Sequence, residues 1–161
     1  MSKKINLLET GNMLLAAQKI VLCCHVSPDG DTLGSALGLA RLLEQKGKEV
    51  TVFVDDDINK SLNFIPGIKK VQRPEAGVIV EADLFVVVDA SSFDRVGICN
   101  EVVKAPVLLN IDHHISNTEF ADYLYLDAEA AAAGEIMCDL FEAMGWEYDE
   151  AIAIDFYTAI T

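Results

Sequence analysis

The stretch Ile20–Gly34, which reads I-V-L-C-C-H-V-S-P-D-G-D-T-L-G, decides the fold. It begins with an apolar run typical of a buried parallel strand, passes through a short turn with proline and glycine, and then enters a helical spacing. His25 ends the strand, and Asp29 and Asp31 follow it closely. A strand that leads through a tight turn into a helix presents such side chains at the carboxyl edge of an α/β sheet, where these folds bind ligands. We therefore expect His25, Asp29 and Asp31 to converge.

The same arrangement occurs twice more along the chain. The apolar run Leu84–Asp89 ends in a carboxylate, and the run Val107–His114 ends in a carboxylate and two imidazoles. All three histidines of the chain lie at the ends of these runs. Three buried parallel strands that stop on metal-ligand residue types predict one shared site at the edge of one sheet. Carboxylates brought close together repel one another, and a divalent cation between them relieves that repulsion.

Helical spacings between the runs complete an α/β pattern. Helices are expected over residues 5–19, from Asp31 to Gly47 with Asp31 or Thr32 as N-cap, from the alanines at 128–133 to Gly145, and from about 149 to 161. A further strand is expected at 49–54. This alternation predicts a Rossmann-like α/β fold, a parallel β-sheet flanked by helices on both faces. At 161 residues the chain is long enough for one domain with a proper core.

Composition narrows the function classes. The net charge of −14 argues against a surface that binds duplex nucleic acid by charge alone. No Lys or Arg follows Lys104, whereas twelve acids do, so this segment is either a solvated acidic face or a surface that docks on something basic. No apolar run approaches the ~20 residues that span a bilayer, so no membrane partner is expected. The start of the chain lacks a signal-peptide pattern, which favours a cytoplasmic location. The four cysteines show no paired spacing and are expected to be reduced core residues.

The candidate ligands are imidazoles and carboxylates without a thiolate. This mixture suits Mn²⁺ and allows Fe²⁺, Co²⁺, Zn²⁺ or Mg²⁺. The carboxylates are too many for one ion and fit two. Paired divalent ions roughly 3.5–4 Å apart clamp the attacking and leaving oxygens of a phosphoryl displacement and lower the pKa of bound water. The pattern therefore predicts metal-assisted phosphoester hydrolysis at a site built from His25, Asp29, Asp31, Asp89 and His113, with Asp112 and His114 beside them.

Three motifs resemble, in order and spacing, the first three signatures of the DHH phosphoesterases. They are His25-x-x-x-Asp29-x-Asp31, Asp89 within V-V-D-A-S-S-F-D-R-V-G, and Asp112-His113-His114. The segments Asn63–Gly67 and Phe156–Ile160 look like the branch that contains the bifunctional oligoribonucleases (nanoRNases) and pAp phosphatases. The resemblance covers nearly the whole chain.

The resemblance implies a phosphoric ester hydrolase that uses two Mn²⁺ ions, with Mg²⁺ or Co²⁺ as substitutes. Its substrates would be short single-stranded oligonucleotides or nucleoside bisphosphates such as 3′-phosphoadenosine 5′-phosphate. His25, Asp29 and Asp89 would hold one ion. Asp31 and His113 would hold the second together with Asp89, which bridges the pair.

The same resemblance implies roles for three neighbouring residues. Asp112 would orient the imidazoles, and His114 would face the scissile phosphate or the attacking water. Arg95 is a candidate for a phosphate contact or, equally, for a structural ion pair. Asn117 is expected to form an Asx-turn rather than to contact substrate.

The chain departs from the family pattern at its end. A fourth family motif supplies a further metal-binding Asp after the stretch that Phe156–Ile160 resembles, and the chain stops at Thr161. The family also has a second domain, DHHA1, which holds the far phosphate of the substrate. The resemblance thus implies that residues 1–161 are the DHH catalytic domain, truncated before the fourth metal-binding motif and without the DHHA1 domain. Alone, this domain is expected to be weakly active or inactive. A manganese-dependent inorganic pyrophosphatase, a non-catalytic metal or nucleotide-binding module, and a homodimer all stay open.

Overall fold

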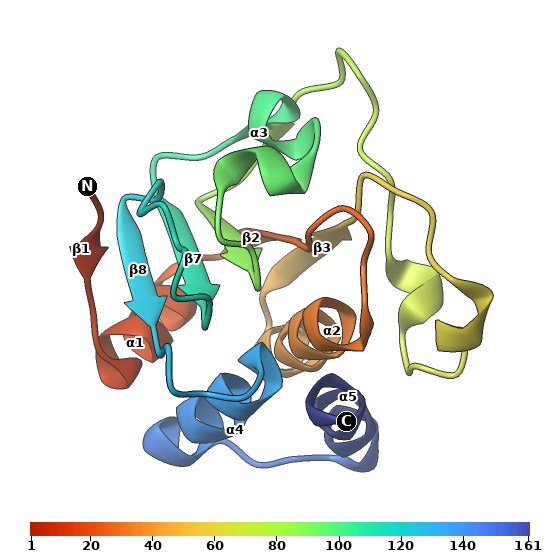
Figure 1. Ribbon diagram of the computed structural model, residues 1–161, viewed down its shortest axis with the longest axis vertical. Coiled ribbons are helices and arrows are strands. Elements are labelled where there is room, and N and C mark those ends of the chain that lie inside the picture. The colour runs from red at the N-terminus through yellow and green to blue at the C-terminus, as the bar shows by residue number, and fades with distance from the viewer.

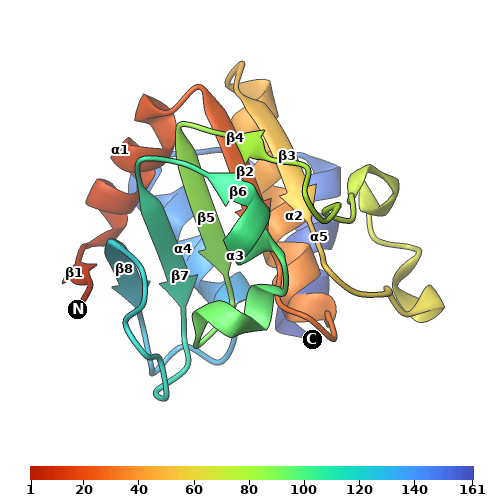
Figure 2. The ribbon, with the colours of Figure 1, turned by 90° about the horizontal axis from the view of Figure 1, so that it is seen from above.

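The computed structural model describes residues 1–161, which form a six-stranded sheet with a two-stranded sheet beside it. All neighbouring strands of the larger sheet run parallel, in the order β1-β8-β7-β5-β2-β3. Figure 2 shows the central strands side by side. The large sheet consists of β1 (Lys3–Lys4), β2 (Lys19–Cys23), β3 (Glu49–Phe53), β5 (Leu84–Val88), β7 (Leu108–Asp112) and β8 (Tyr123–Leu126). The small parallel sheet pairs β4 (Val80–Glu81) with β6 (Val103–Lys104).

Helices cover both faces of the large sheet, but unequally. The longer helices share one core with one face of the sheet, as Figures 1 and 2 show; they are α1 (Leu7–Ala16), α2 (Gly30–Gln45), α4 (Ala133–Met144) and α5 (Glu150–Ile160). The opposite face is covered by α3 (Cys99–Val102) and the 3₁₀ turn η3 (Phe93–Val96). Two more 3₁₀ turns, η1 (Lys60–Leu62) and η2 (Ile68–Lys70), connect β3 to β4. The expected parallel α/β fold is confirmed.

The apolar run that begins the opening motif is buried on both sides. Ile20 and Leu22 of β2 belong to the core under the four long helices, and Val21 and Cys23 belong to the core under α3. Side chains of a strand alternate between its two faces, so burial of both faces requires the unbroken apolar run seen in the sequence. The cysteines are free thiols. Cys23, Cys24 and Cys99 are buried as expected, whereas Cys138 is only half-buried and does not fit that expectation.

The strand order reverses beside β2. From β2 the chain passes through α2 to β3 on one side, whereas the later strands β5, β7 and β8 are added on the other side. The connections that follow β2 and β5 therefore diverge at the carboxyl edge. A crevice at such a switch point is where open α/β sheets bind ligands. His25 and Asp89 follow these two strands.

Two expected helix starts need correction. Helix α2 begins at Gly30 and is capped by Asp29, not by Asp31 or Thr32, because the extended backbone of Asp29 lets its Oδ1 accept the Thr32 N–H at 3.0 Å. Helix α4 begins at Ala133 rather than among the preceding alanines. Its first N–H groups bind a carboxylate from another part of the chain, described below.

Helix α5 packs against the first turns of α2. A Cβ atom on Gly34 would collide with the carbonyl oxygen of Asp155, and one on Gly38 would collide with the ring of Phe156. The two glycines therefore allow the close approach that places α5 beside the start of α2. No helix in the structure combines the length and the apolar character needed to cross a membrane.

Candidate metal centre

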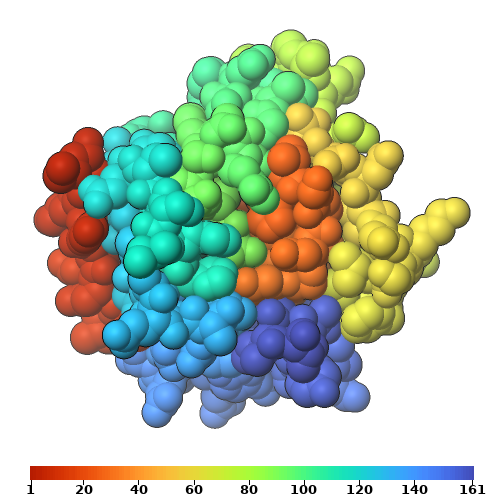
Figure 3. All heavy atoms as spheres, viewed as in Figure 1, coloured from red at the N-terminus to blue at the C-terminus, as the bar shows by residue number.

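The ligand-type side chains predicted from the three motifs meet at the carboxyl edge of the sheet. His25 lies two residues after β2, Asp89 directly follows β5, and His113 directly follows β7. Asp29 and Asp31 stand at the start of α2. Figure 3 shows the corresponding segments, orange, green and teal, gathered around the middle of one face of the molecule. Asp89 lies at the centre of this group, with contacts to both His25 and His113.

His25 directs one ring nitrogen at carboxylates. Its Nδ1 lies 2.7 Å from the carbonyl oxygen of Val26, which can only accept, so Nδ1 carries a proton. Its Nε2 lies 3.6 Å from Oδ1 of Asp29 and 3.4 Å from Oδ2 of Asp89. Burial lowers the pKa of His25, but its contacts with the two carboxylates outweigh burial and raise that pKa to about 10. Without another cation, the site therefore retains a proton on this ring.

His113 repeats this arrangement on the other side of Asp89. Its Nδ1 lies 3.2 Å from the carbonyl oxygen of Ala130, and its Nε2 lies 3.2 Å from Oδ1 of Asp89 and 3.5 Å from Oδ2 of Asp31. A backbone carbonyl that binds one ring nitrogen fixes the tautomer that offers the other nitrogen to a metal ion. Both histidines thus present Nε2 to the same carboxylate.

Asp89 is buried and its backbone has a positive φ. The residue is 3% exposed, and its Oδ1 accepts no hydrogen bond. Its φ of +62° lies in the left-handed region, which is rare for residues other than glycine and is enriched at functional sites. Buried carboxylate oxygens that face the Nε2 atoms of two histidines need protons or metal cations between them. The donor set therefore fits a divalent metal on each side of Asp89.

The two aspartates at the start of α2 differ in their surroundings. Contact with His25, together with the Thr32 N–H, lowers the pKa of Asp29 to about 2. Burial and the nearby charge of Asp89 raise the pKa of Asp31 to about 6. Both groups are carboxylates that an adjacent metal ion would keep ionised.

Asp31 also caps a distant helix. Its Oδ2 accepts the N–H of Ala133 and its Oδ1 accepts the N–H of Gly134, each at 2.9 Å. Ala132, the residue before α4, provides no side-chain cap. Asp31 thereby satisfies two of the N–H groups that the first turn of a helix leaves free.

His114 lies beside Asp89 and His113, but one of its ring nitrogens is bound to Asp112. Asp89, His113 and His114 offer atoms within 4.8 Å of one another. However, Nδ1 of His114 lies 2.6 Å from Oδ1 of Asp112, and this hydrogen bond occupies that nitrogen. Only Nε2 of His114 remains available, and its side chain is 42% exposed.

Arg95 lies next to His25 at the rim. Its Nη2 is 3.4 Å from Nδ1 of His25, and both groups carry protons, so the contact is not a hydrogen bond. Its backbone carbonyl accepts the N–H of Val26. Arg95 forms no salt bridge, so its exposed guanidinium is free to meet an anion.

Three positions around the site were not predicted as parts of it. Oγ1 of Thr32 donates to the carbonyl oxygen of Val88 at 3.1 Å and accepts from the backbone N–H of His25 at 3.4 Å, and so links α2 to two strand ends. Nδ2 of Asn117 donates to Oδ1 of Asn110 and to Oδ2 of Asp112. A polar Asn110 inside the otherwise apolar run of β7 is the sequence signal that could have found this network. The expected Asx-turn is confirmed, since Oδ1 of Asn117 accepts the Glu119 N–H at 2.8 Å.

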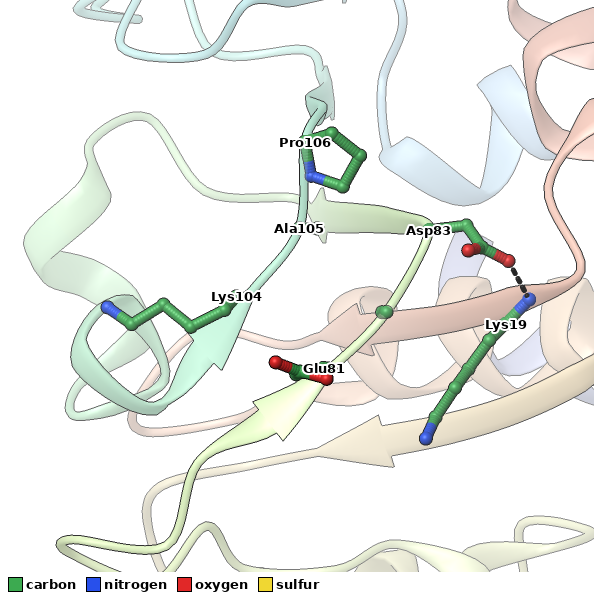
Figure 4. Close-up of a pocket in the computed structure, with 7 residues that line it drawn as sticks. Lys19, Glu81, Asp83, Lys104, Ala105 and Pro106 are labelled. Carbon is green, nitrogen blue, oxygen red and sulfur yellow. Dashed lines mark hydrogen bonds between the residues drawn. The ribbon is translucent and has the colours of Figure 1, made fainter.

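A separate cavity lies at the amino ends of the strands. It has a volume of about 540 Å³ and is lined by Lys19, Glu81, Ala82, Asp83, Lys104, Ala105 and Pro106. Figure 4 shows Asp83 bound to the backbone of Lys19, a hydrogen bond of 2.7 Å. None of the residues around Asp89 lines this cavity, so the cavity is not part of the candidate metal centre.

Relatives resemble this chain in sequence along most of its length. The bifunctional oligoribonuclease and PAP phosphatase NrnA of Thermus thermophilus is 34% identical over 88% of this chain and 42% of its own length. The protein of the same name from Mycoplasma pneumoniae is 30% identical over 98% of this chain and 50% of its own length. The chain thus spans about half the length of these relatives.

Solved structures show the same fold. An exopolyphosphatase-related protein from Bacteroides fragilis superposes with a TM-score of 0.86 at 28% identity, over 94% of this chain and 48% of its own. RecJ from Thermus thermophilus, solved in complex with Mn²⁺, gives a TM-score of 0.51 at 18% identity over 88% of this chain and 21% of its own. The second likeness concerns the fold alone. Residues 19–160 match the family described as DHH family, N-terminal domain, and the chain therefore belongs to the DHH family.

Proposed function

We propose that this domain is the catalytic part of a metal-dependent phosphoesterase that hydrolyses short oligonucleotides or nucleoside bisphosphates. The observation that supports the proposal most strongly is the position of Asp89 between two imidazole nitrogens, 3.4 Å from Nε2 of His25 and 3.2 Å from Nε2 of His113. A single carboxylate shared in this way suits a pair of metal ions.

The residues present define two sets of donors. His25, Asp29 and Asp89 would hold one ion, and Asp31, Asp89 and His113 would hold the other. We assign Asp31 rather than His114 to the second set because Nδ1 of His114 is bound to Asp112. Imidazole and carboxylate without thiolate favour Mn²⁺, with Mg²⁺ or Co²⁺ as substitutes. When bound, the ions supply Lewis-acid stabilisation of phosphate oxygens and acidify a water molecule.

His114 and Arg95 are the groups of this chain proposed to face the substrate. Asp112 accepts a hydrogen bond from Nδ1 of His114. Nε2 of His114 is then free to accept a proton near the reacting phosphate and to return it. The guanidinium of Arg95 carries a permanent charge and suits a phosphate oxygen. These roles make proton transfer depend on His114 and substrate affinity depend on Arg95.

Charge supports a small substrate. The chain has a net charge of −14, which disfavours binding of a long nucleic acid by charge. A short oligonucleotide or a nucleoside bisphosphate presents only a few phosphates, which the metal ions and Arg95 can neutralise locally. The name of the relatives described above, bifunctional oligoribonuclease and PAP phosphatase, refers to such substrates.

Turnover of three substrates by the purified protein with Mn²⁺ tests the proposal. We expect release of mononucleotides from a diribonucleotide and of phosphate from 3′-phosphoadenosine 5′-phosphate, and much slower release from pyrophosphate. Asp57→Asn serves as a control and should leave turnover unchanged, because the side chain of Asp57 is exposed and its ion pair is with Arg73, outside the site. Preferential hydrolysis of pyrophosphate would identify an inorganic pyrophosphatase instead. Binding of Mn²⁺ and nucleotide without any turnover, by this chain and also by a longer chain that includes a DHHA1 domain, would identify a non-catalytic binding module.

A further inference from the structure

Asp112 is held by a side-chain network that reaches across two strands. One of its oxygens, Oδ1, accepts from His114 at 2.6 Å, and the other, Oδ2, accepts from Nδ2 of Asn117 at 2.7 Å. Nδ2 of Asn117 also lies 2.7 Å from Oδ1 of Asn110. Nδ2 of Asn110 in turn donates to the carbonyl oxygens of Val87 at 3.1 Å and Ala90 at 3.3 Å. The network therefore runs from the end of β5, beside Asp89, to His114.

The partners fix the orientation of both amides. Asn110 faces two backbone carbonyls, which only accept, so its NH₂ group must point toward them. Its oxygen then faces Asn117, whose NH₂ group must also meet the carboxylate of Asp112. The remaining oxygen of Asn117 accepts the Glu119 N–H at 2.8 Å. Both N–H bonds of each amide are used, and reversing either amide would place like groups together.

Burial makes this network costly to leave incomplete. Asn110 and Asp112 are both 0% exposed, so water does not replace a lost partner easily. No Lys or Arg pairs with Asp112, and Asn117 is the side chain that binds its second oxygen. Without Asn117 the carboxylate would lose this restraint and could turn away from His114.

We propose that Asn117 and Asn110 are positioning residues that hold Asp112 against Nδ1 of His114. Through Asp112 they fix the tautomer of His114 in which Nδ1 carries the proton and Nε2 is the atom offered to the substrate. The effect on turnover rests on the proposed function, whereas the effect on the tautomer does not. Residues that orient a catalytic or metal-binding histidine in this way typically change activity by about 10- to 100-fold when they are removed.

Nitrogen NMR of ¹⁵N-histidine-labelled, metal-free protein tests the tautomer directly. The chain contains three histidines, so each ring can be assigned by substitution. At mildly alkaline pH we expect Nδ1 of His114 to resonate as a protonated nitrogen. In Asn117→Ala its two nitrogen shifts should move toward the average of two exchanging tautomers, while those of His25 and His113 stay in place. The matched control is Thr118→Ala, which removes a neighbouring contact of the same loop, Thr118 to the Ser91 carbonyl oxygen, without touching the network.

Kinetics with the proposed substrates provides the second measurement. We expect Asn117→Ala to lower kcat by about 10- to 100-fold with KM within about twofold, and Thr118→Ala to leave both unchanged. Asn117→Ser retains one hydroxyl donor and should give an intermediate loss, and it serves if the alanine variant does not fold. Unchanged His114 nitrogen shifts in a folded Asn117 variant would overturn the proposal. If the parent protein hydrolyses none of the substrates but Asn117→Ala still loses the Nδ1-protonated tautomer of His114, the positioning role is upheld and the proposed function is rejected.

Discussion

His25 and His113 approach Asp89 from its two carboxylate oxygens, with Nε2 of His25 3.4 Å from Oδ2 and Nε2 of His113 3.2 Å from Oδ1. Each ring binds a backbone carbonyl through Nδ1, so neither can turn away without losing that bond. The backbone of Asp89 is held in the left-handed region, with its N–H bound to the carbonyl oxygen of Ile111. The ends of three strands thus place the buried carboxylate of Asp89 between His25 and His113, where it belongs to both proposed sets of metal ligands.

Asp31 should stabilise α4 independently of any metal. Its carboxylate binds the N–H groups of Ala133 and Gly134, so Asp31→Ala leaves both without a partner. We expect this variant to lose about 0.5–2 kcal/mol of unfolding free energy, the usual cost of removing a helix cap. Urea denaturation of metal-free protein at about pH 5, where protonation of Asp31 removes its repulsion with Asp89, measures the loss. Equal stability of Asp31→Ala and the parent would show that the contact with α4 contributes nothing.

Stability should fall as pH rises, because of Asp155. Burial raises its pKa to about 7, although the guanidinium of Arg41, 3.9 Å away on α2, lowers it and Asp149 raises it. The folded protein therefore holds this proton more tightly than the unfolded chain, whose pKa is near 3.8. Stability from this group is complete below about pH 4 and is lost as pH rises through about 7, by at most about 4 kcal/mol. In Asp155→Asn this part of the pH dependence of urea denaturation should disappear, and an unchanged profile would contradict the assignment.

Gly34→Ala should disturb the contact between α2 and α5. The added Cβ would collide with the backbone carbonyl of Asp155, which cannot move as a side chain can. We expect a loss of about 1–3 kcal/mol, typical of overpacking in a buried contact. Glu44→Ala, on the exposed part of the same helix, should change stability by no more than about 0.5 kcal/mol. Chemical denaturation of the two variants makes the comparison, and equal midpoints would refute the close approach.

The sequence predicted the parts of this structure that local patterns determine. Apolar runs that end at His25, Asp89 and Asp112 are recognisable because a buried parallel strand requires an unbroken apolar segment. The convergence of His25, Asp29, Asp31, Asp89 and His113 follows from placing those strands in one parallel sheet, and the structure brings them together.

Other features depend on contacts between distant segments. Asp31 lies 102 residues before Ala133, whose N–H it binds, and no local pattern links the two. For that reason the start of α4 was placed too early in the sequence. The positive φ of Asp89 and the network through Asn110 likewise arise from tertiary packing. Asp31 or Thr32 was expected to cap α2 because Asp and Thr are both favourable N-cap residues, and the local sequence does not distinguish these two positions from Asp29.

Arg95 should affect substrate affinity more than the chemical step. Its guanidinium makes no ion pair and stands beside His25. We expect Arg95→Ala to raise KM for 3′-phosphoadenosine 5′-phosphate about 10-fold, equivalent to about 1.4 kcal/mol, with a smaller change in kcat. Lys46→Ala, which removes a positive charge at the far end of α2, is the control. An unchanged KM would leave Arg95 without a role in substrate binding.

The most direct measurement is calorimetric titration of Mn²⁺ into the parent protein and into Asp89→Asn. Asparagine keeps the size of the side chain and tolerates a positive φ, so the fold is preserved. Asp57→Asn makes the same chemical change at an exposed position. We predict two ions bound by the parent and by Asp57→Asn, and loss of both from Asp89→Asn, because one carboxylate serves both positions. Two ions bound by Asp89→Asn with unchanged affinity would contradict the shared centre.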